Sequence, residues 1–194
     1  MKNIPKTMHA VLLTGHGGLE KLEYKTDIPV PVPKNDEVLI KVTAAGINNT
    51  DINTRTAWYS KYKSNVGGSW SGAPLKFPRI QGADVCGVIV STGSKVDKLR
   101  IEERVIARTM QTDPKNPSSP NMVTLGSELN GAFAQYVTIR SSEAFSVNCK
   151  WSDAELGSIP CSYSTAEGLL YRVKLEAEKI FINGASGGVG SAAI

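Results

Sequence analysis

Short apolar or alternating runs, interrupted by Gly, Pro, Asn and Asp, dominate the first 150 residues of this 194-residue chain. The clearest of them are Met8–Leu13, Glu37–Ala44, Asp84–Ser91, Arg104–Ala107 and Ala132–Ile139. Runs this short between turn-forming residues are typical of β-strands, because helices usually need more residues. The pattern predicts an irregular all-β domain over residues 1–150, in a chain that is mainly β with some helix (α+β).

Two proline-containing segments limit the sheets of this domain. Pro29, Pro31 and Pro33 precede the run 37–44, and proline cannot donate to a central ladder, so they predict an edge or a connecting arm. The segment 108–130 is polar, carries further prolines and has little strand character. We expect it to be a long surface loop beside the active-site cleft, with a plain solvent loop as the alternative.

The pattern changes after residue 150. Ser152 and Glu155 have the spacing of an N-cap and its capping-box partner, which predicts a helix start. A second helix is expected over 164–171, where Ala166, Leu169 and Leu170 follow helical spacing, and a short strand over 178–183. We therefore expect connecting helices over 151–178 and a new domain that begins at 179.

A glycine-rich turn, GASGGVG, occupies residues 184–190 and leads into a helix of small residues. Such a turn places free backbone N–H groups and the positive end of a helix dipole against a pyrophosphate. Gly187 would let the backbone approach the phosphates, and Gly190 would let the helix pack closely on the strand, although Ala185 replaces the first glycine of GxGxxG. The turn predicts a dinucleotide site formed by Ala185, Ser186, Gly187, Gly188, Val189 and Gly190.

Composition excludes several other classes of function. The net charge of +4 arises from basic residues that are spread along the chain without interleaved aromatics, so we expect no nucleic-acid partner. No run approaches the roughly 20 apolar residues that span a bilayer, and no signal peptide is evident, so we expect a cytoplasmic protein with no membrane partner. Cys86, Cys149 and Cys161 lack CxxC spacing, which predicts free thiols.

Four further segments are distinctive: MHAV (8–11) with GGLE (17–20), EVLIKVTAAGIN (37–48), FPRIQGADVCGVI (77–89) and GAFAQYV (131–137). Together with the glycine turn they resemble, in the same order, the medium-chain dehydrogenase/reductases of the alcohol dehydrogenase superfamily, and most nearly the quinone oxidoreductases and zeta-crystallin-like proteins. The resemblance covers essentially the whole chain. It implies a GroES-like irregular β-barrel catalytic domain, connecting helices and the first βα turn of a Rossmann domain, truncated at residue 194.

The resemblance also implies that the catalytic zinc of the alcohol dehydrogenases is missing. The three zinc-ligand positions of those enzymes correspond here to Asn48, Ala83 and Cys161, and zinc needs three protein ligands and an open position. Asp84 matches a neighbouring glutamate and could in principle join Cys161, but an oxygen and sulfur pair without histidine would be a poor site. We expect no metal, with Cys161 as a half-buried residue beside the nicotinamide pocket and Cys86 as a core residue.

Without zinc, hydrogen-bond donors must polarise the substrate carbonyl, and Asn48, Thr50, Tyr59 or Tyr163 could supply them. The resemblance places Thr50 at the family's proton-relay hydroxyl and Thr165 at a threonine that contacts the nicotinamide ring. The alternative is structural: Asn48 and Asp51 would only cap the turn after their strand, and Tyr59 would only pack.

The resemblance implies an NAD(P)H-dependent oxidoreductase that transfers hydride to a quinone, an enone, or an aldehyde or ketone. NADP(H) is expected rather than NAD(H), although the residue that distinguishes them would lie about 20 residues past the glycines, beyond Ile194. The expected partners are the small-molecule carbonyl or quinone substrate and, in the full-length form, further copies in a homodimer or homotetramer. We expect the isolated chain to be inactive.

Two other hypotheses stay open. One is an alcohol dehydrogenase with a degenerate zinc site, which metal analysis would separate from a zinc-free reductase. The other is a non-catalytic crystallin-like protein or a stand-alone binding module, which need not bind nicotinamide. Cofactor titration would separate that protein from an enzyme.

Overall fold

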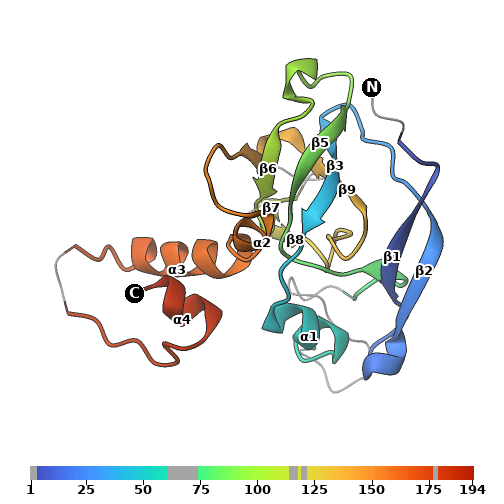
Figure 1. Ribbon diagram of the computed structural model, residues 1–194. Helices are drawn as coiled ribbons and strands as arrows, with labels where there is room; N and C mark the ends of the chain where they lie inside the picture. The colour runs from blue at the N-terminus through green and yellow to red at the C-terminus, as the bar shows by residue number, and fades with distance from the viewer. Residues whose placement is uncertain (1–3, 61–73, 114–117, 119–121, 177–178) are drawn as a thin grey trace.

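The computed structural model describes residues 4–60, 74–113, 118, 122–176 and 179–194. Its strands gather into one β body, from which two helices and the C-terminal residues project to one side (Figure 1). The strands are β1 (Thr7–Leu13), β2 (Leu22–Pro29), β3 (Glu37–Ala44), β4 (Arg79–Ile80), β5 (Cys86–Thr92), β6 (Arg104–Ala107), β7 (Met110–Thr112), β8 (Met122–Thr124), β9 (Tyr136–Arg140) and β10 (Ala144–Ser146). The helices are α1 (Asn49–Arg55), α2 (Asp153–Leu156), α3 (Pro160–Arg172) and α4 (Gly188–Ala192), with 3₁₀ turns η1 (Leu19–Lys21), η2 (Lys98–Arg100) and η3 (Ser141–Glu143).

The larger sheet has the strand order β10-β6-β5-β3-β9 and is antiparallel throughout. Its strand β3 is buried on both faces. Val38 and Ile40 belong to one apolar cluster, whereas Leu39 between them belongs to another, because successive side chains of a strand point to opposite faces. This strand therefore joins the two cores of the β body.

The smaller sheet, β2-β1-β4, covers the second apolar cluster, to which Met8, Ala10 and Ile80 contribute. Its strand β2 lies at the edge of the sheet and ends at Pro29. The prediction that the prolines mark an edge or a connecting arm is therefore confirmed: Pro29 ends the edge strand, and Pro31 and Pro33 lie in the irregular segment that leads to β3. The strand β2 itself has no signal in the sequence, because six of its eight residues are exposed and carry no apolar alternation.

The other predicted strands are confirmed with shifted ends. β3 and β6 have the predicted bounds, β1 begins one residue earlier, and β5 begins at Cys86 rather than Asp84. β9 begins at Tyr136, four residues later than predicted. The residues before it leave the ladder to contact other segments, as when Phe133 accepts a hydrogen bond from the backbone of Val11 and donates one to Gln81.

The interpretation of segment 108–130 as a loop is wrong for part of its length. β7 and β8 form an antiparallel hairpin in which Met110 pairs with Thr124 and Thr112 with Met122. Polar composition concealed this hairpin because its buried Gln111 is satisfied locally, the side-chain amide donating to the carbonyl of Arg108 at 2.9 Å. Residues 114–117 and 119–121 of the segment lie outside the described part of the chain.

Two predicted helices are present. Ser152 caps α2 through the predicted capping box, in which Glu155 Oε2 accepts from the backbone N of Ser152 at 2.7 Å. α3 begins at Pro160, four residues before the predicted start, and proline at the first helical position needs no hydrogen-bond partner for its nitrogen. Among the described helices none is long and apolar enough to cross a membrane.

The predicted strand over 178–183 is not formed in the described part of this segment. Glu178 lies outside that part, and residues 179–182 adopt no regular structure. A strand requires a hydrogen-bonded neighbour, and the described residues offer this segment none. The glycine turn and the helix after it are confirmed: Gly184 has φ of 75° and α4 begins at Gly188.

One arginine fixes the helices to the β body. The guanidinium of Arg104, on β6, pairs with Asp153 at 2.7 Å and donates to the carbonyls of Cys149 and Trp151. These contacts hold the segment that leads into α2. They therefore fix the start of α2 to strand β6 of the larger sheet.

Candidate active site

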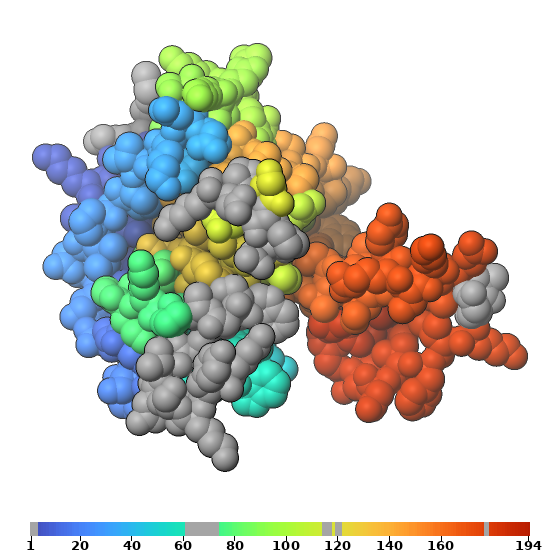
Figure 2. All heavy atoms as spheres, turned by 180° about the vertical axis from the view of Figure 1, so that it is seen from behind, coloured from blue at the N-terminus to red at the C-terminus, as the bar shows by residue number. Residues whose placement is uncertain are grey.

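A cleft of about 870 Å³ lies between the β body and the C-terminal part of the chain. It is lined by residues 47–50 and Tyr59, by the β7–β8 hairpin, by one face of α3, and by residues of the segment 180–193. In Figure 2 the C-terminal part, coloured orange to red, stands apart from the β body, with a gap beside α1. The cleft therefore collects residues from the domain and from the helix and turn that follow it.

Asn48 lies where β3 gives way to α1. It is the N-cap of α1 and forms a capping box with Asp51, whose Oδ2 accepts from the backbone N of Asn48 at 2.9 Å. Asn48 also lines the cleft. The structural interpretation of Asn48 and Asp51 as caps is thus confirmed, and it coexists with a position of Asn48 in the cleft wall.

A buried carboxylate, Asp84, lies behind Asn48. Its Oδ2 accepts from Asn48 Nδ2 at 2.8 Å, and its Oδ1 accepts from the backbone N of Cys161 at 2.6 Å. Burial raises the pKa of Asp84, while these two hydrogen bonds act in the opposite direction. Both oxygens are engaged with donors of the chain, so Asp84 is not free to serve as a metal ligand with Cys161.

Asp51 is a second buried acid of the site. Burial raises its pKa to about 6, even though backbone hydrogen bonds from Asn48, Gly82 and Ala83 lower it, and the nearby charge of Asp84 raises it further. Gly82 donates to Asp51 Oδ1 at 3.2 Å, and the Gln81 side chain donates to the Asp51 carbonyl at 2.8 Å. These contacts tie α1 to the segment that precedes β5.

Thr50 and Tyr59 form a pair of hydroxyl groups in the cleft wall. The phenol of Tyr59 donates to Thr50 Oγ1 at 3.1 Å, and the Asn53 amide donates weakly to the same phenol at 3.5 Å. Both hydroxyl residues line the cleft. Because Thr50 accepts from Tyr59, its own proton is available for an oxygen in the cleft.

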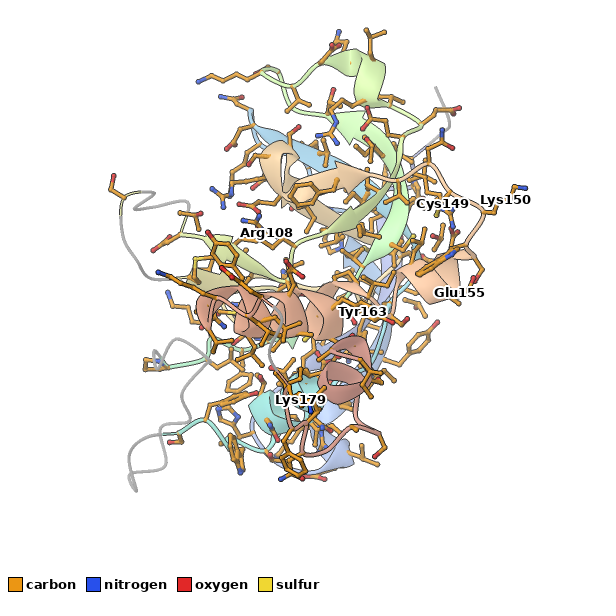
Figure 3. The ribbon with its side chains drawn as sticks, turned by 90° about the vertical axis from the view of Figure 1, so that its left-hand side faces the viewer. Arg108, Cys149, Lys150, Glu155, Tyr163 and Lys179 are labelled. Atoms are coloured by element: carbon orange, nitrogen blue, oxygen red, sulfur yellow. The ribbon has the colours of Figure 1, made fainter. Side chains whose placement is uncertain are left out.

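α3 places its two predicted site residues differently. Thr165 lines the cleft, and its hydroxyl donates to the carbonyl of Cys161 at 2.7 Å. Tyr163, labelled on α3 in Figure 3, is 47% exposed and does not line the cleft. Tyr163 is therefore the one predicted residue of α3 that the structure leaves outside the cleft.

The glycine turn forms the opposite wall of the cleft. Gly187, Gly188, Val189 and Gly190 line it, whereas Ala185 and Ser186 are exposed and do not. A Cβ at Gly190 would overlap the carbonyl of Gly184 and lie 2.8 Å from Ala185 Cα. The turn is thus closed tightly by glycine and leaves backbone N–H groups at the start of α4 uncovered, which fits a dinucleotide phosphate.

The three positions that correspond to zinc ligands do not make a zinc site. Asn48 is a neutral amide that donates to Asp84, and Ala83 has only a methyl group. Burial, with the charges of Asp84 and Asp51, raises the pKa of the Cys161 thiol to about 12, which keeps it protonated. Within the described residues no three His, Cys, Asp or Glu side chains gather as a metal-binding group.

Several lining residues were not predicted. Thr109, Met110 and Thr124 enter the cleft from the β7–β8 hairpin, which the sequence concealed. Leu169 and Leu170 enter from α3, each four residues after another lining residue, Thr165 and Ala166, and a spacing of four places residues on one face of a helix. Cys161 lies half-buried in the cleft wall and Cys86 is fully buried in the core, as predicted.

An irregular antiparallel β body, followed by helices and a glycine turn that meet it at a cleft, defines the catalytic domain of the alcohol dehydrogenase class. The chain belongs to the medium-chain dehydrogenase/reductases: the family model for the alcohol dehydrogenase GroES-like domain matches residues 34–148.

Relatives agree with this assignment. The chain is 31% identical to a chloroplastic quinone-oxidoreductase homolog of Spinacia oleracea over 97% of its own length and 52% of the relative. It is 32% identical to a chloroplastic NADPH-dependent alkenal/one oxidoreductase of Arabidopsis thaliana over 99% of its own length and 45% of the relative. The chain thus spans about half the length of these curated relatives.

Among solved structures, one from Sinorhizobium meliloti 1021, assigned as an alcohol dehydrogenase, superposes with a TM-score of 0.91. The two chains are 44% identical, and the match covers 100% of this chain and 55% of the other. This similarity extends over the connecting helices and the glycine turn as well as the β body, so the predicted GroES-like fold class is confirmed.

Proposed function

We propose that this chain is the substrate-binding part of an NAD(P)H-dependent reductase that transfers hydride to a quinone, an enone or an aldehyde without a catalytic metal. The observation that carries the proposal is a hydrogen-bond donor, the Asn48 amide, that lines the cleft and is held by a buried carboxylate. Where the alcohol dehydrogenases have a zinc ligand, Asn48 presents an amide held at the cleft wall by Asp84. The names of relatives that reduce quinones and alkenals support the same substrate class.

The residues that would hold the cofactor lie on one side of the cleft. Gly187, Gly188 and Gly190 leave the backbone accessible to phosphate, and Thr165 lies on the adjoining face of α3. When bound there, NAD(P)H would supply a hydride to the substrate. The NADPH dependence of the Arabidopsis relative favours NADP(H), which is our proposal for this protein as well.

The residues on the other side would manage the charge that the reaction creates. When hydride adds to the electrophilic carbon, the bonding electrons move to the carbonyl or quinone oxygen, which becomes negative. An N–H of Asn48 and the hydroxyl of Thr50 can stabilise this oxygen by hydrogen bonds, without the Lewis acid that zinc would provide. Tyr59 donates to Thr50 and can pass a proton to it when Thr50 protonates the oxygen, and solvent water would then restore the proton of Tyr59.

The test uses the protein at its natural length. NADPH and NADH are titrated by fluorescence, and NADPH oxidation is then measured with a quinone, a cyclic enone, an aldehyde and a ketone. We expect turnover with at least one of these acceptors in the presence of EDTA. Asn48→Asp, which removes the amide N–H at nearly constant shape, should lower kcat about 100-fold.

Two results would contradict the proposal. Alcohol oxidation that requires added zinc would indicate a dehydrogenase with an altered metal site. A protein that binds neither dinucleotide would indicate a structural or binding role.

A further inference from the structure

Asp84 joins three segments that are distant in sequence. It precedes β5, it accepts from Asn48 at the end of the β3 segment, and it accepts from Cys161 in the first turn of α3. Its side chain is almost fully buried, with 1% exposure. The N-cap residue of α3, Ile159, has no side-chain acceptor, so Asp84 satisfies a backbone N–H that the helix itself leaves unpaired.

The neighbouring chain is shaped to admit this carboxylate. A Cβ at Gly46 would lie 2.7 Å from Asp84 Oδ2 and 2.6 Å from the carbonyl oxygen of Gly157. Gly46 also donates to that carbonyl at 3.0 Å. Any side chain at residue 46 would therefore displace either the Asp84 carboxylate, which is the partner of Asn48, or the Gly157 carbonyl, which connects residue 46 to the segment between α2 and α3.

The chemistry of a carboxylate decides how the Asn48 amide is turned. Both oxygens of Asp84 accept hydrogen bonds, Oδ1 from the backbone N of Cys161 and Oδ2 from the Asn48 side chain, so the nitrogen of the amide, and not its oxygen, faces Asp84. The capping box with Asp51 holds the rest of the residue in place. One N–H of the amide is engaged by Asp84, and the second has no acceptor among the described residues.

We propose that Asp84 is a positioning residue, which fixes the Asn48 amide so that its second N–H is available to the substrate oxygen and links that donor to the first turn of α3. This inference rests on the proposed function. It assigns a task to a buried carboxylate that lies behind the cleft wall. Asp84 determines that the nitrogen of the Asn48 amide faces it. It also holds Asn48 at a fixed position relative to α3, which lines the cleft.

Asp84→Asn tests the polarity directly. The oxygen of the new amide is required by the backbone N of Cys161, so its NH₂ group must face Asn48. The Asn48 amide then has to turn over and offer its oxygen, and the cleft loses an N–H donor. We expect kcat for NADPH-dependent reduction to fall at least tenfold, while KM for NADPH changes by less than about twofold.

Exchanging the side chains of residues 48 and 84 distinguishes a role of Asp84 in positioning the Asn48 amide from a role in stability alone. In the double variant Asn48→Asp with Asp84→Asn, donor and acceptor trade places and both hydrogen bonds of residue 84 can form. The single variant Asn48→Asp places two carboxylates face to face and should lower Tm clearly. The double variant should recover most of that Tm but remain at least tenfold reduced in kcat, because no N–H donor stands at position 48.

Glu143→Gln is the matched control. Glu143 is likewise a buried carboxylate, 5% exposed, but it pairs with Arg108 and Arg140 and does not line the cleft. It should lower Tm without a selective loss of kcat. The inference is overturned if Asp84→Asn keeps kcat within about twofold of the parent protein, or if the double variant recovers activity together with Tm.

A failure of the proposed function would look different. A parent protein that oxidises NADPH with none of the acceptors would refute the reductase, whereas Tm of the variants would still report on residues 48 and 84. If the double variant recovers no Tm, the two residues are not coupled and the positioning role is refuted whatever the activity.

Discussion

Thr109 directly precedes β7 and Thr124 ends β8, and the backbone N of Leu125 donates to the carbonyl of Thr109 at 3.0 Å. Both threonines are buried and both line the cleft. The hydroxyl of Thr109 donates to the carbonyl of Ala83 at 3.1 Å. The hydroxyl of Thr124 is buried without a hydrogen-bond partner in the described structure.

This difference predicts opposite effects of the same substitution. Thr124→Val replaces an unsatisfied hydroxyl by a methyl group of equal size and should raise the free energy of unfolding by about 1 kcal/mol. Thr109→Val leaves the carbonyl of Ala83 without its donor and should lower it by about 1–2 kcal/mol. Urea titration of the two variants beside the parent protein measures both. A destabilised Thr124→Val would show that its hydroxyl has a partner in solution.

The free energy of unfolding should decrease as pH rises, because Asp51 loses its proton. Burial raises the pKa of this carboxyl from 3.8 to about 6 in the folded chain. The folded state therefore holds the proton more tightly, so the contribution of Asp51 is fully present below about pH 4 and is lost as pH rises through about 6. At about 1.4 kcal/mol per pKa unit, the loss approaches about 3 kcal/mol.

Asp51→Asn isolates this effect. The variant loses an acceptor for backbone N–H groups, which adds a constant offset, but it cannot titrate. The free energy of unfolding of the parent protein minus that of the variant should decrease between pH 4 and pH 7. A difference that increases over this range would mean that the hydrogen bonds from Asn48 and Gly82 outweigh burial.

Gly190→Ala should damage the dinucleotide turn. A methyl group at this position overlaps the Gly184 carbonyl, so the turn must open or α4 must shift. We expect NADPH affinity to fall at least tenfold while Tm of the β body stays unchanged. Gly168→Ala is the control, since its Cβ would meet only the Arg172 side chain at 3.5 Å and alanine favours the helix. Unchanged affinity in Gly190→Ala would contradict the assignment of the turn.

Purified protein at its natural length should contain well under one equivalent of zinc. The three positions that would have to bind zinc hold Asn48, Ala83 and Cys161. An amide and a methyl group are no zinc ligands, and burial raises the pKa of the Cys161 thiol to about 12. Elemental analysis after dialysis measures the content. One equivalent of zinc that resists chelation and disappears in Cys161→Ala would contradict this expectation.

The sequence predicts correctly those elements whose signal lies within the element itself. β3 and β6 follow from their buried runs, and the start of α2 follows from Ser152 and Glu155, whose contact is internal to the turn. The strand β2 could not be predicted, because it lies at an edge and most of its side chains are exposed, so it lacks an apolar pattern. The β7–β8 hairpin could not be predicted, because its buried residue Gln111 is polar. A hydrogen bond from the Gln111 side chain to the Arg108 carbonyl offsets the cost of burying it.

The candidate site divides in the same way. Asn48, Thr50 and Thr165 could be named from their positions in matched segments, and all three line the cleft. The environment of Asp84 could not be inferred, because its partner Cys161 is 77 residues away and contributes a backbone atom, which carries no residue-specific signal. Tyr163 was predicted by residue type, whereas the turn of α3 decides which side chains face the cleft.

The pairing of β3 with β9 has a consequence for how the chain acquires its structure. Glu37 pairs with Arg140, so this edge of the sheet joins residues about 100 positions apart. During synthesis β3 can pair with β5 early, but its other edge remains open until β9 has left the ribosome. Such non-local pairing slows folding, because loop-closure entropy is spent before the contacts form. The strand β3 therefore keeps one edge unpaired for longer than the other while the domain is being made.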